Sequence, residues 1–111
     1  MDLTLNDIIK VFEQTKKGCC EIEFCVKGMD TYTLCWMGKI PDKDNDEKIC
    51  YWYGLVPDGS QAYDYDNFED FSTATVFEGL SLLDIADKIE YISVNACPPT
   101  RETLLEMGYK L

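Results

Sequence analysis

Carboxylates and aromatic rings dominate the segment Tyr63–Phe71, whose sequence is YDYDNFEDF. Its nine residues contain four carboxylates and four aromatic rings. Such a mixture is suited to two kinds of chemistry. Paired carboxylates such as Asp64 and Asp66 can act as acid and base in catalysis. Carboxylates on a rigid fold, with rings among them, can instead bind a basic surface of another protein.

Catalysis has little support in the remainder of the chain. There is no histidine, so the commonest general base and the commonest metal ligand are both missing. Carboxylate pairs occur by chance in a chain with 21 acidic residues. Neither a Gly-x-Gly-x-x-Gly nor a Gly-Lys-Ser/Thr phosphate-binding motif is present. We therefore predict a protein that is not an enzyme and that binds no cofactor.

Two patterns resemble metal sites but have the wrong spacing. The segment Asp42–Glu47 places acids at the first, third and fifth positions of a calcium loop. Glu47 then stands where glycine is needed, and Tyr53 stands where the bidentate Glu belongs. The six cysteines form no Cys-x-x-Cys pair and are too sparse for a disulfide scaffold. We predict no metal site and free thiols.

The acidity of the chain is concentrated in its middle. Ten basic and 21 acidic side chains give a formal net charge of −11. Residues 41–70 hold nine acids and two bases, so they contribute −7 of this charge. Contact with phosphates needs a basic face, and we therefore predict no direct binding of nucleic acid. The predicted partner is a protein with a basic surface.

The predicted partner-binding residues come from this middle region and from the aromatic run before it. Tyr51 and Trp52 point to opposite faces of any strand that contains them, and Trp52 is the ring expected to face outward. The full set is Asp64, Asp66, Glu69, Asp70, Tyr63, Tyr65 and Trp52. The competing interpretation is an ordinary acidic face that only keeps the protein in solution.

Capping and periodicity indicate the elements that position these residues. Thr4 and Asp7 have the spacing of a helix cap, and the apolar pattern predicts a helix from Leu5 to Lys16. Period-two alternation then predicts a hairpin that turns near Gly28. Its inner-facing residues are expected to be Ile22, Phe24 and Val26 in the first strand and Tyr32, Leu34 and Trp36 in the second.

The second half of the chain continues the sheet and adds short helices. We expect a third strand with Ile49, Tyr51, Tyr53 and Leu55 on one face, a turn at Asp58-Gly59 and a fourth strand at Gln61–Tyr65. Asp66 with Glu69, Ser81 with Asp84, and Thr100 are expected to cap short helices, and residues 89–95 to form a last strand.

Together these elements predict an α+β fold. Residues 1–111 are expected to form a single domain. Its mainly antiparallel sheet of four to five strands packs with the N-terminal helix and with two or three short helices from the C-terminal half.

The sequence also predicts a location. Its longest apolar runs are only a few residues, far short of the roughly 20 that span a membrane. The N-terminal segment MDLTLNDIIK has acid where a secretory signal has base. We therefore expect no membrane span and a cytoplasmic protein.

Three segments carry a resemblance: YWYGLVPDG, YDYDNFEDF and GLSLLDIADKIEYISVN. In them the chain resembles the small, acidic, uncharacterised proteins that bacterial mobile elements carry. The resemblance implies an accessory role, such as that of anti-restriction or anti-CRISPR proteins, and assigns no residue. We expect an inhibitor that occupies a basic, nucleic-acid-binding surface of a partner protein. The alternatives are an immunity or antitoxin-like protein that neutralises a basic toxin, and a general interaction module.

Overall fold

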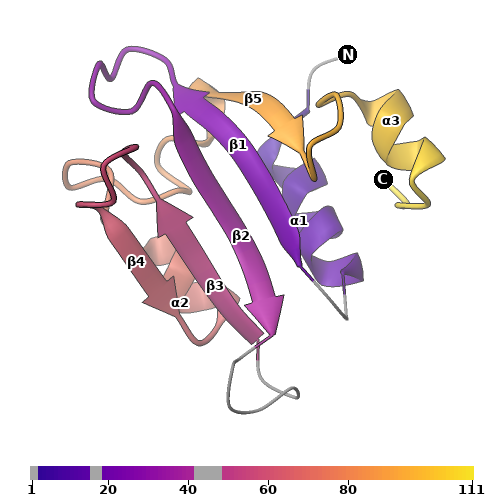
Figure 1. Ribbon diagram of the computed structural model, residues 1–111, viewed down its shortest axis with the longest axis horizontal. Helices are drawn as coiled ribbons and strands as arrows, with labels where there is room; N and C mark the ends of the chain where they lie inside the picture. The colour runs from indigo at the N-terminus through magenta and orange to yellow at the C-terminus, as the bar shows by residue number, and fades with distance from the viewer. Residues whose placement is uncertain (1–2, 16–18, 42–48) are drawn as a thin grey trace.

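A five-stranded antiparallel sheet organises the chain (Figure 1). The computed structural model describes residues 3–15, 19–41 and 49–111. The strands are β1 (Cys20–Val26), β2 (Cys35–Pro41), β3 (Ile49–Gly54), β4 (Ala62–Tyr65) and β5 (Ile89–Val94), in the order β4-β3-β2-β1-β5. The helices are α1 (Leu5–Gln14), α2 (Phe68–Thr73) and α3 (Arg101–Glu106), with a 3-10 turn η1 (Ala86–Lys88). The predicted α+β fold is confirmed.

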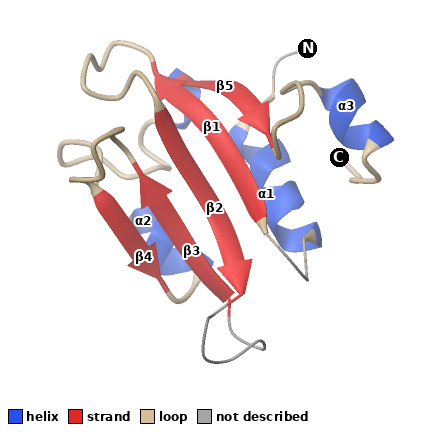
Figure 2. Cartoon of the chain, viewed as in Figure 1, coloured by secondary structure: helices blue, strands red, loops and turns tan. Residues whose placement is uncertain are grey.

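The helices cover only one face of the sheet. In Figure 2, α1 and α2 lie behind the strands and α3 lies beside the β5 edge. None of the helices in the described part of the chain lies in front of the sheet. The sheet therefore has a covered face, which holds the core, and an uncovered face. Within the described residues, no helix is long and apolar enough to cross a membrane.

The core lies between the covered face and α1 with α2. The register places Phe24 opposite Cys35 and Met37 opposite Tyr53. From α1, Ile8, Val11 and Phe12 occupy one face of the helix and are buried. In the third strand, Tyr53 and the following Leu55 point inward as predicted, with 1% and 0% of their surface exposed. No disulfide joins the six cysteines, all of which are among the described residues.

The second strand begins later than predicted, and its side chains point to the faces opposite to those predicted. It begins at Cys35, and the buried residues are Cys35 and Met37 rather than the predicted Leu34 and Trp36. Tyr32 is buried as expected, but it packs from the connection between β1 and β2. Residues in a connection need not alternate between two faces. The alternation counted from Tyr32 therefore does not continue into β2. Trp36 therefore lies on the uncovered face.

The start of α2 is also shifted from its prediction. The cap is Asn67, whose Oδ1 accepts from the backbone N–H of Asp70 at 2.8 Å. The predicted pair of Asp66 and Glu69 is wrong by one residue. With Asn67 as cap, the rings of Phe68 and Phe71 come one turn apart, and both pack with the aromatic core.

The other predicted helix starts have mixed outcomes. The caps at Thr4 and Thr100 are confirmed. Ser81 and Asp84 exchange the expected hydrogen bonds, of 2.9 and 3.2 Å, but the helix predicted after them is replaced by turns and η1. The helix predicted to reach Lys16 ends at Gln14, with Thr15 as its C-cap, and the segment at 42–47 lies outside the described residues.

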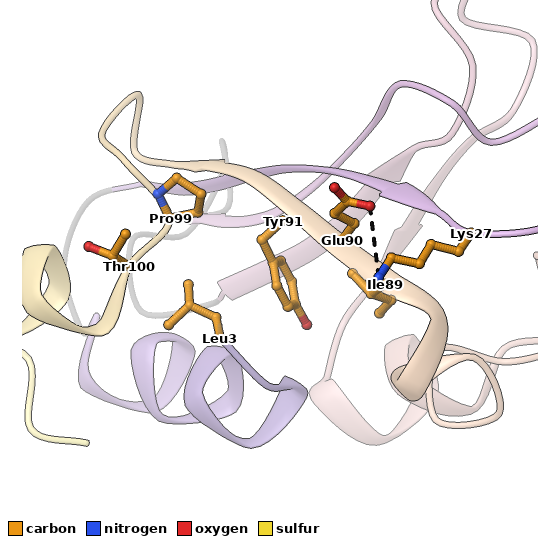
Figure 3. A pocket seen from close by; sticks show the side chains of 7 residues that line it. All are labelled: Leu3, Lys27, Ile89, Glu90, Tyr91, Pro99 and Thr100. Carbon is orange, nitrogen blue, oxygen red and sulfur yellow. Dashed lines mark ion pairs between the residues drawn. The ribbon is translucent and has the colours of Figure 1, made fainter. Parts of the chain in front are cut away.

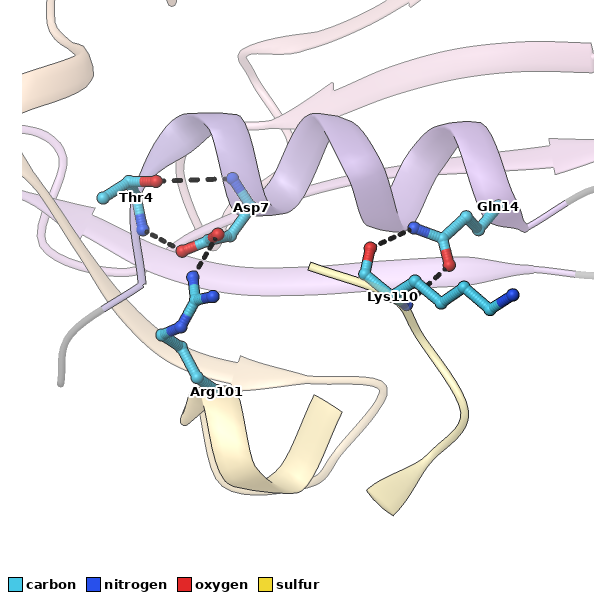
Figure 4. Close-up of polar contacts among 5 residues, drawn as sticks. All are labelled: Thr4, Asp7, Gln14, Arg101 and Lys110. Atoms are coloured by element: carbon cyan, nitrogen blue, oxygen red, sulfur yellow. Dashed lines mark hydrogen bonds and ion pairs between the residues drawn. The ribbon is translucent and has the colours of Figure 1, made fainter. Parts of the chain in front are cut away.

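Polar contacts fasten α1 to the C-terminal segment (Figure 4). Arg101 donates to Oδ1 of the buried Asp7 at 2.6 Å, and the N–H of Thr4 donates to its Oδ2 at 3.0 Å. At the other end of α1, the Gln14 amide exchanges two hydrogen bonds with the backbone of Lys110. Burial acts to raise the pKa of Asp7, but the hydrogen bond from Thr4 and the charge of Arg101 outweigh it and lower that pKa.

We expect Asp7→Asn to lower the free energy of unfolding by about 2 kcal/mol near neutral pH, because the carboxylate that accepts from the Thr4 N–H and from Arg101 is lost. The folded pKa lies below the ordinary value of 3.8. The contribution is therefore complete above that value and disappears as pH falls through the folded pKa. Urea unfolding of both proteins at several pH values checks this. A difference that persists unchanged in strong acid would contradict it.

Candidate functional site

The uncovered face of the sheet carries both tryptophans of the chain. Successive side chains of a strand point to opposite faces, so the residues between the core positions lie here. We call this surface the tryptophan face. It comprises Glu21, Glu23 and Cys25 of β1, Trp36, Gly38 and Ile40 of β2, Cys50, Trp52 and Gly54 of β3, and Ala62 and Asp64 of β4.

The strand register arranges the tryptophan face in two rows across the sheet. One row contains Glu23, Trp36, Gly54 and Ala62, and the next contains Glu21, Gly38, Trp52 and Asp64. Each tryptophan therefore has a glycine on one neighbouring strand and a carboxylate on the other. Directly opposed side chains in an antiparallel pair start about 5 Å apart. Each tryptophan is thus flanked by one carboxylate within reach of a group bound over its ring.

Gly38 allows Trp52 to lie against the sheet. A Cβ atom at Gly38 would lie 2.8 and 2.9 Å from two ring atoms of Trp52, and it would also collide with the carbonyl oxygen of Cys20. These separations are too short for any side chain at that position. The indole therefore rests on bare backbone, and the two residues act as one structural unit.

We expect Gly38→Ala to lower the free energy of unfolding by about 1–3 kcal/mol and to shift the tryptophan emission, because the indole must move. Gly54→Ala is the matched control. A Cβ at Gly54 would make only an ordinary contact, 3.8 Å from the ring of Trp52, so its effect should stay within about 0.5 kcal/mol. Thermal melts followed by fluorescence check both variants. Equal losses would contradict this packing.

An acidic edge adjoins the tryptophan face. The chain from residue 49 to residue 87 contains eight acids and no lysine or arginine, and it forms β3, β4, α2 and the connection that follows. We define the acidic edge as the exposed carboxylates at or next to β4 and α2: Asp58, Asp64, Asp66, Glu69 and Asp70. Within the described ranges, the ion pairs are Lys27 with Glu90 and Arg101 with Asp7. No described cation therefore neutralises the acidic edge.

The structure brings some of the predicted binding residues together and separates others. Trp52 and Asp64 are direct neighbours on the tryptophan face. Asp66, Glu69 and Asp70 are exposed around the start of α2, next along the chain from β4. Five of the seven predicted residues therefore lie in or beside three elements that follow one another along the chain, β3, β4 and α2.

The two predicted tyrosines point the other way. Tyr63 pairs with Tyr53 and Tyr65 pairs with Tyr51, so both side chains lie on the covered side of β4. The ring of Tyr65 meets that of Tyr53 edge-on at 6.1 Å, and burial raises its pKa. Tyr63, at the border of the sheet, is 37% exposed. Tyr65 thus belongs to the packing, whereas Tyr63 remains accessible beside the acidic edge.

The sequence pattern missed Trp36 and its neighbours as candidate residues. A signal for them exists in the repeat Trp-x-Gly, at Trp36 to Gly38 and again at Trp52 to Gly54. When two such strands pair antiparallel, each tryptophan can lie opposite the glycine of the other, as it does here. Glycines in strands commonly mark the close approach of another group.

A pocket lies at the opposite edge of the sheet (Figure 3). It has a volume of about 290 Å³ and is lined by Leu3, Tyr91 and Pro99, with Lys27 and Glu90 to one side. The Tyr91 hydroxyl is buried and finds no hydrogen-bond partner within the described chain. Across the described ranges, no three acidic or cysteine side chains gather closely enough to hold a metal ion.

Comparison with known proteins supplies no match. No protein-family model, no curated protein and no solved structure matches this chain. The inference of function therefore depends on the geometry and charge of its own residues.

Proposed function

We propose that this chain is a non-catalytic module that binds a basic surface of a partner protein through the acidic edge and the adjoining tryptophan face. One observation carries the proposal: residues 49–87 contain no base, and their fold displays exposed carboxylates without a described cation nearby. A field of one sign attracts partners of the opposite sign and accelerates their association. Aromatic side chains beside the charges supply the apolar contact that holds a complex together.

The proposed consequence of binding is inhibition. A basic surface that binds nucleic acid recognises an array of negative charges held at fixed spacing. Carboxylates fixed at the end of β4 and the start of α2 form such an array, so they compete with nucleic acid for the same surface.

Affinity capture from the native host, with this chain as bait, tests the proposal. We expect the captured partner to have a basic nucleic-acid-binding surface, to elute as salt is raised, and to be displaced by added nucleic acid. A basic partner that nucleic acid does not displace would instead support neutralisation of a basic toxin. Capture of acidic partners only, retained in high salt, would contradict the proposal.

A further inference from the structure

We propose that the tryptophan face binds arginine side chains of the partner, with a guanidinium stacked on each indole and hydrogen-bonded to the carboxylate beside it. This inference rests on the proposed function and names the residue type that the site recognises. The two candidate positions are Trp36 with Glu23 and Trp52 with Asp64.

The geometry of the two positions suits a guanidinium. Trp36 is directly opposite Glu23, and Trp52 is directly opposite Asp64. A cation binds an aromatic face within about 6 Å of the ring centroid, and opposed side chains of a sheet start about 5 Å apart. The planar guanidinium has five N–H donors, so it can stack on the ring while it donates to the carboxylate.

Both indoles are accessible and have no cation of their own within the described chain. Among the described residues, neither indole N–H has a hydrogen-bond partner, and neither is a buried polar atom left without one, so both N–H groups reach solvent. The one described cation over an aromatic ring is Lys39, 5.8 Å from the centroid of Tyr51 on the covered face. Each indole is therefore open to a cation from outside.

The charge of the face selects a cationic group as the occupant. Lys39 is the only basic residue in the five strands, and it is buried on the covered face, where it donates to the carbonyl oxygen of Phe12. The tryptophan face itself carries the carboxylates Glu21, Glu23 and Asp64. Arginine suits this face better than lysine, because its charge is delocalised, less strongly hydrated and able to stack.

A defined peptide probe tests the inference on the full chain. The probe is a ten-residue peptide with four arginines separated by alanines, compared with the same peptide containing lysine or citrulline, which is neutral but similar in shape to arginine. The chain has two tryptophans, both on this face, so the indole N–H signals in an NMR spectrum report on this face alone. We expect the arginine peptide to shift both signals, the lysine peptide to bind about threefold or more weakly, and the citrulline peptide to leave both in place.

Variants assign the binding to rings and carboxylates separately. Replacing both tryptophans, as Trp36→Leu with Trp52→Leu, should weaken the binding of the arginine peptide about 3- to 30-fold. Glu21→Gln with Glu23→Gln keeps the rings and touches no core residue, and it should also weaken binding. Glu102→Gln with Glu106→Gln removes the same charge from α3 and should change binding less than twofold.

Two results separate this inference from the proposed function. If the arginine and citrulline peptides bind alike, or if the arginine peptide leaves both indole signals unmoved, the inference is wrong. The proposed function would survive that failure if neutralising the acidic edge still slowed association with the captured partner about tenfold or more. Conversely, arginine binding at the indoles with a captured partner that is indifferent to the acidic edge would overturn the proposed function alone.

Discussion

Changing Asp64, Asp66, Glu69 and Asp70 together to Asn or Gln is expected to slow association with the captured partner about tenfold or more. All four carboxylates are exposed, and no described cation neutralises them. Charges at the border of an interface act mainly on the rate of encounter, so the dissociation rate should change much less. Surface plasmon resonance measures both rates.

A matched variant controls for net charge. Glu13, Asp30, Glu102 and Glu106 are exposed and lie outside residues 49–87, and their neutralisation changes the net charge by the same amount. This control should slow association less than about threefold, because charges beyond the screening length of about 8 Å contribute little in physiological salt. Raising the salt should slow the wild-type protein and the control, but hardly the first variant. Fast, salt-independent association of the first variant would contradict the proposed function.

The folded state of the neutralised variant must be checked separately. Glu69 and Asp70 lie in the first turn of α2, where negative charge stabilises a helix by about 0.3–1 kcal/mol. Asn67 still caps the helix, because its bond goes to the backbone N–H of residue 70. Circular dichroism melts should therefore show a small loss of stability and no loss of fold.

Tyr53→Ala is expected to have the largest effect on stability and to lower the free energy of unfolding by about 3–5 kcal/mol. The ring of Tyr53 is 1% exposed and stacks on Phe71, with centroids 4.1 Å apart and planes 11° apart. It also meets Phe77 edge-on at 5.5 Å, and its hydroxyl donates to the carbonyl oxygen of Phe71 at 2.7 Å. A loss of this size is a large part of the 5–15 kcal/mol that stabilises a typical domain.

Two further variants divide this effect into its parts. Tyr53→Phe keeps the ring contacts and removes the hydrogen bond, so it should cost about 1–2 kcal/mol. Tyr63→Ala, opposite Tyr53 on β4 but 37% exposed, should cost less than about 1 kcal/mol. Urea unfolding measures all three. If Tyr63→Ala were as damaging as Tyr53→Ala, the assignment of β4 to the border of the core would be wrong.

Local patterns in the sequence predicted much of the fold. The cap at Thr4 and the apolar face of α1 could be predicted because both depend on residues within one or two helical turns. The facing of Tyr53 and Trp52 could be predicted because strict alternation holds along an uninterrupted strand. The same alternation shows that at least one large ring of this strand lies outside the core.

Features that depend on pairing between distant segments could not be predicted from local patterns. The face on which Trp36 lies depends on where the connection after β1 ends and β2 begins. Tyr32 belongs to that connection, and its side chain is buried. The alignment of Glu23 with Trp36 and of Asp64 with Trp52 depends on the register of four strands. Tyr65 was predicted as a binding residue, yet its parity with Tyr51 across the β3–β4 pair turns it toward the core.

Titration of the isotope-labelled chain with the captured partner, followed by NMR, tests the central claim most directly. We expect the backbone signals of residues 64–70 and the indole signals of Trp36 and Trp52 to change most, because these residues form the acidic edge and the tryptophan face. The signals of α3, residues 101–106, should remain in place. Changes that concentrate on α3 or around the Tyr91 pocket, with the acidic edge and both indoles unaffected, would contradict the account.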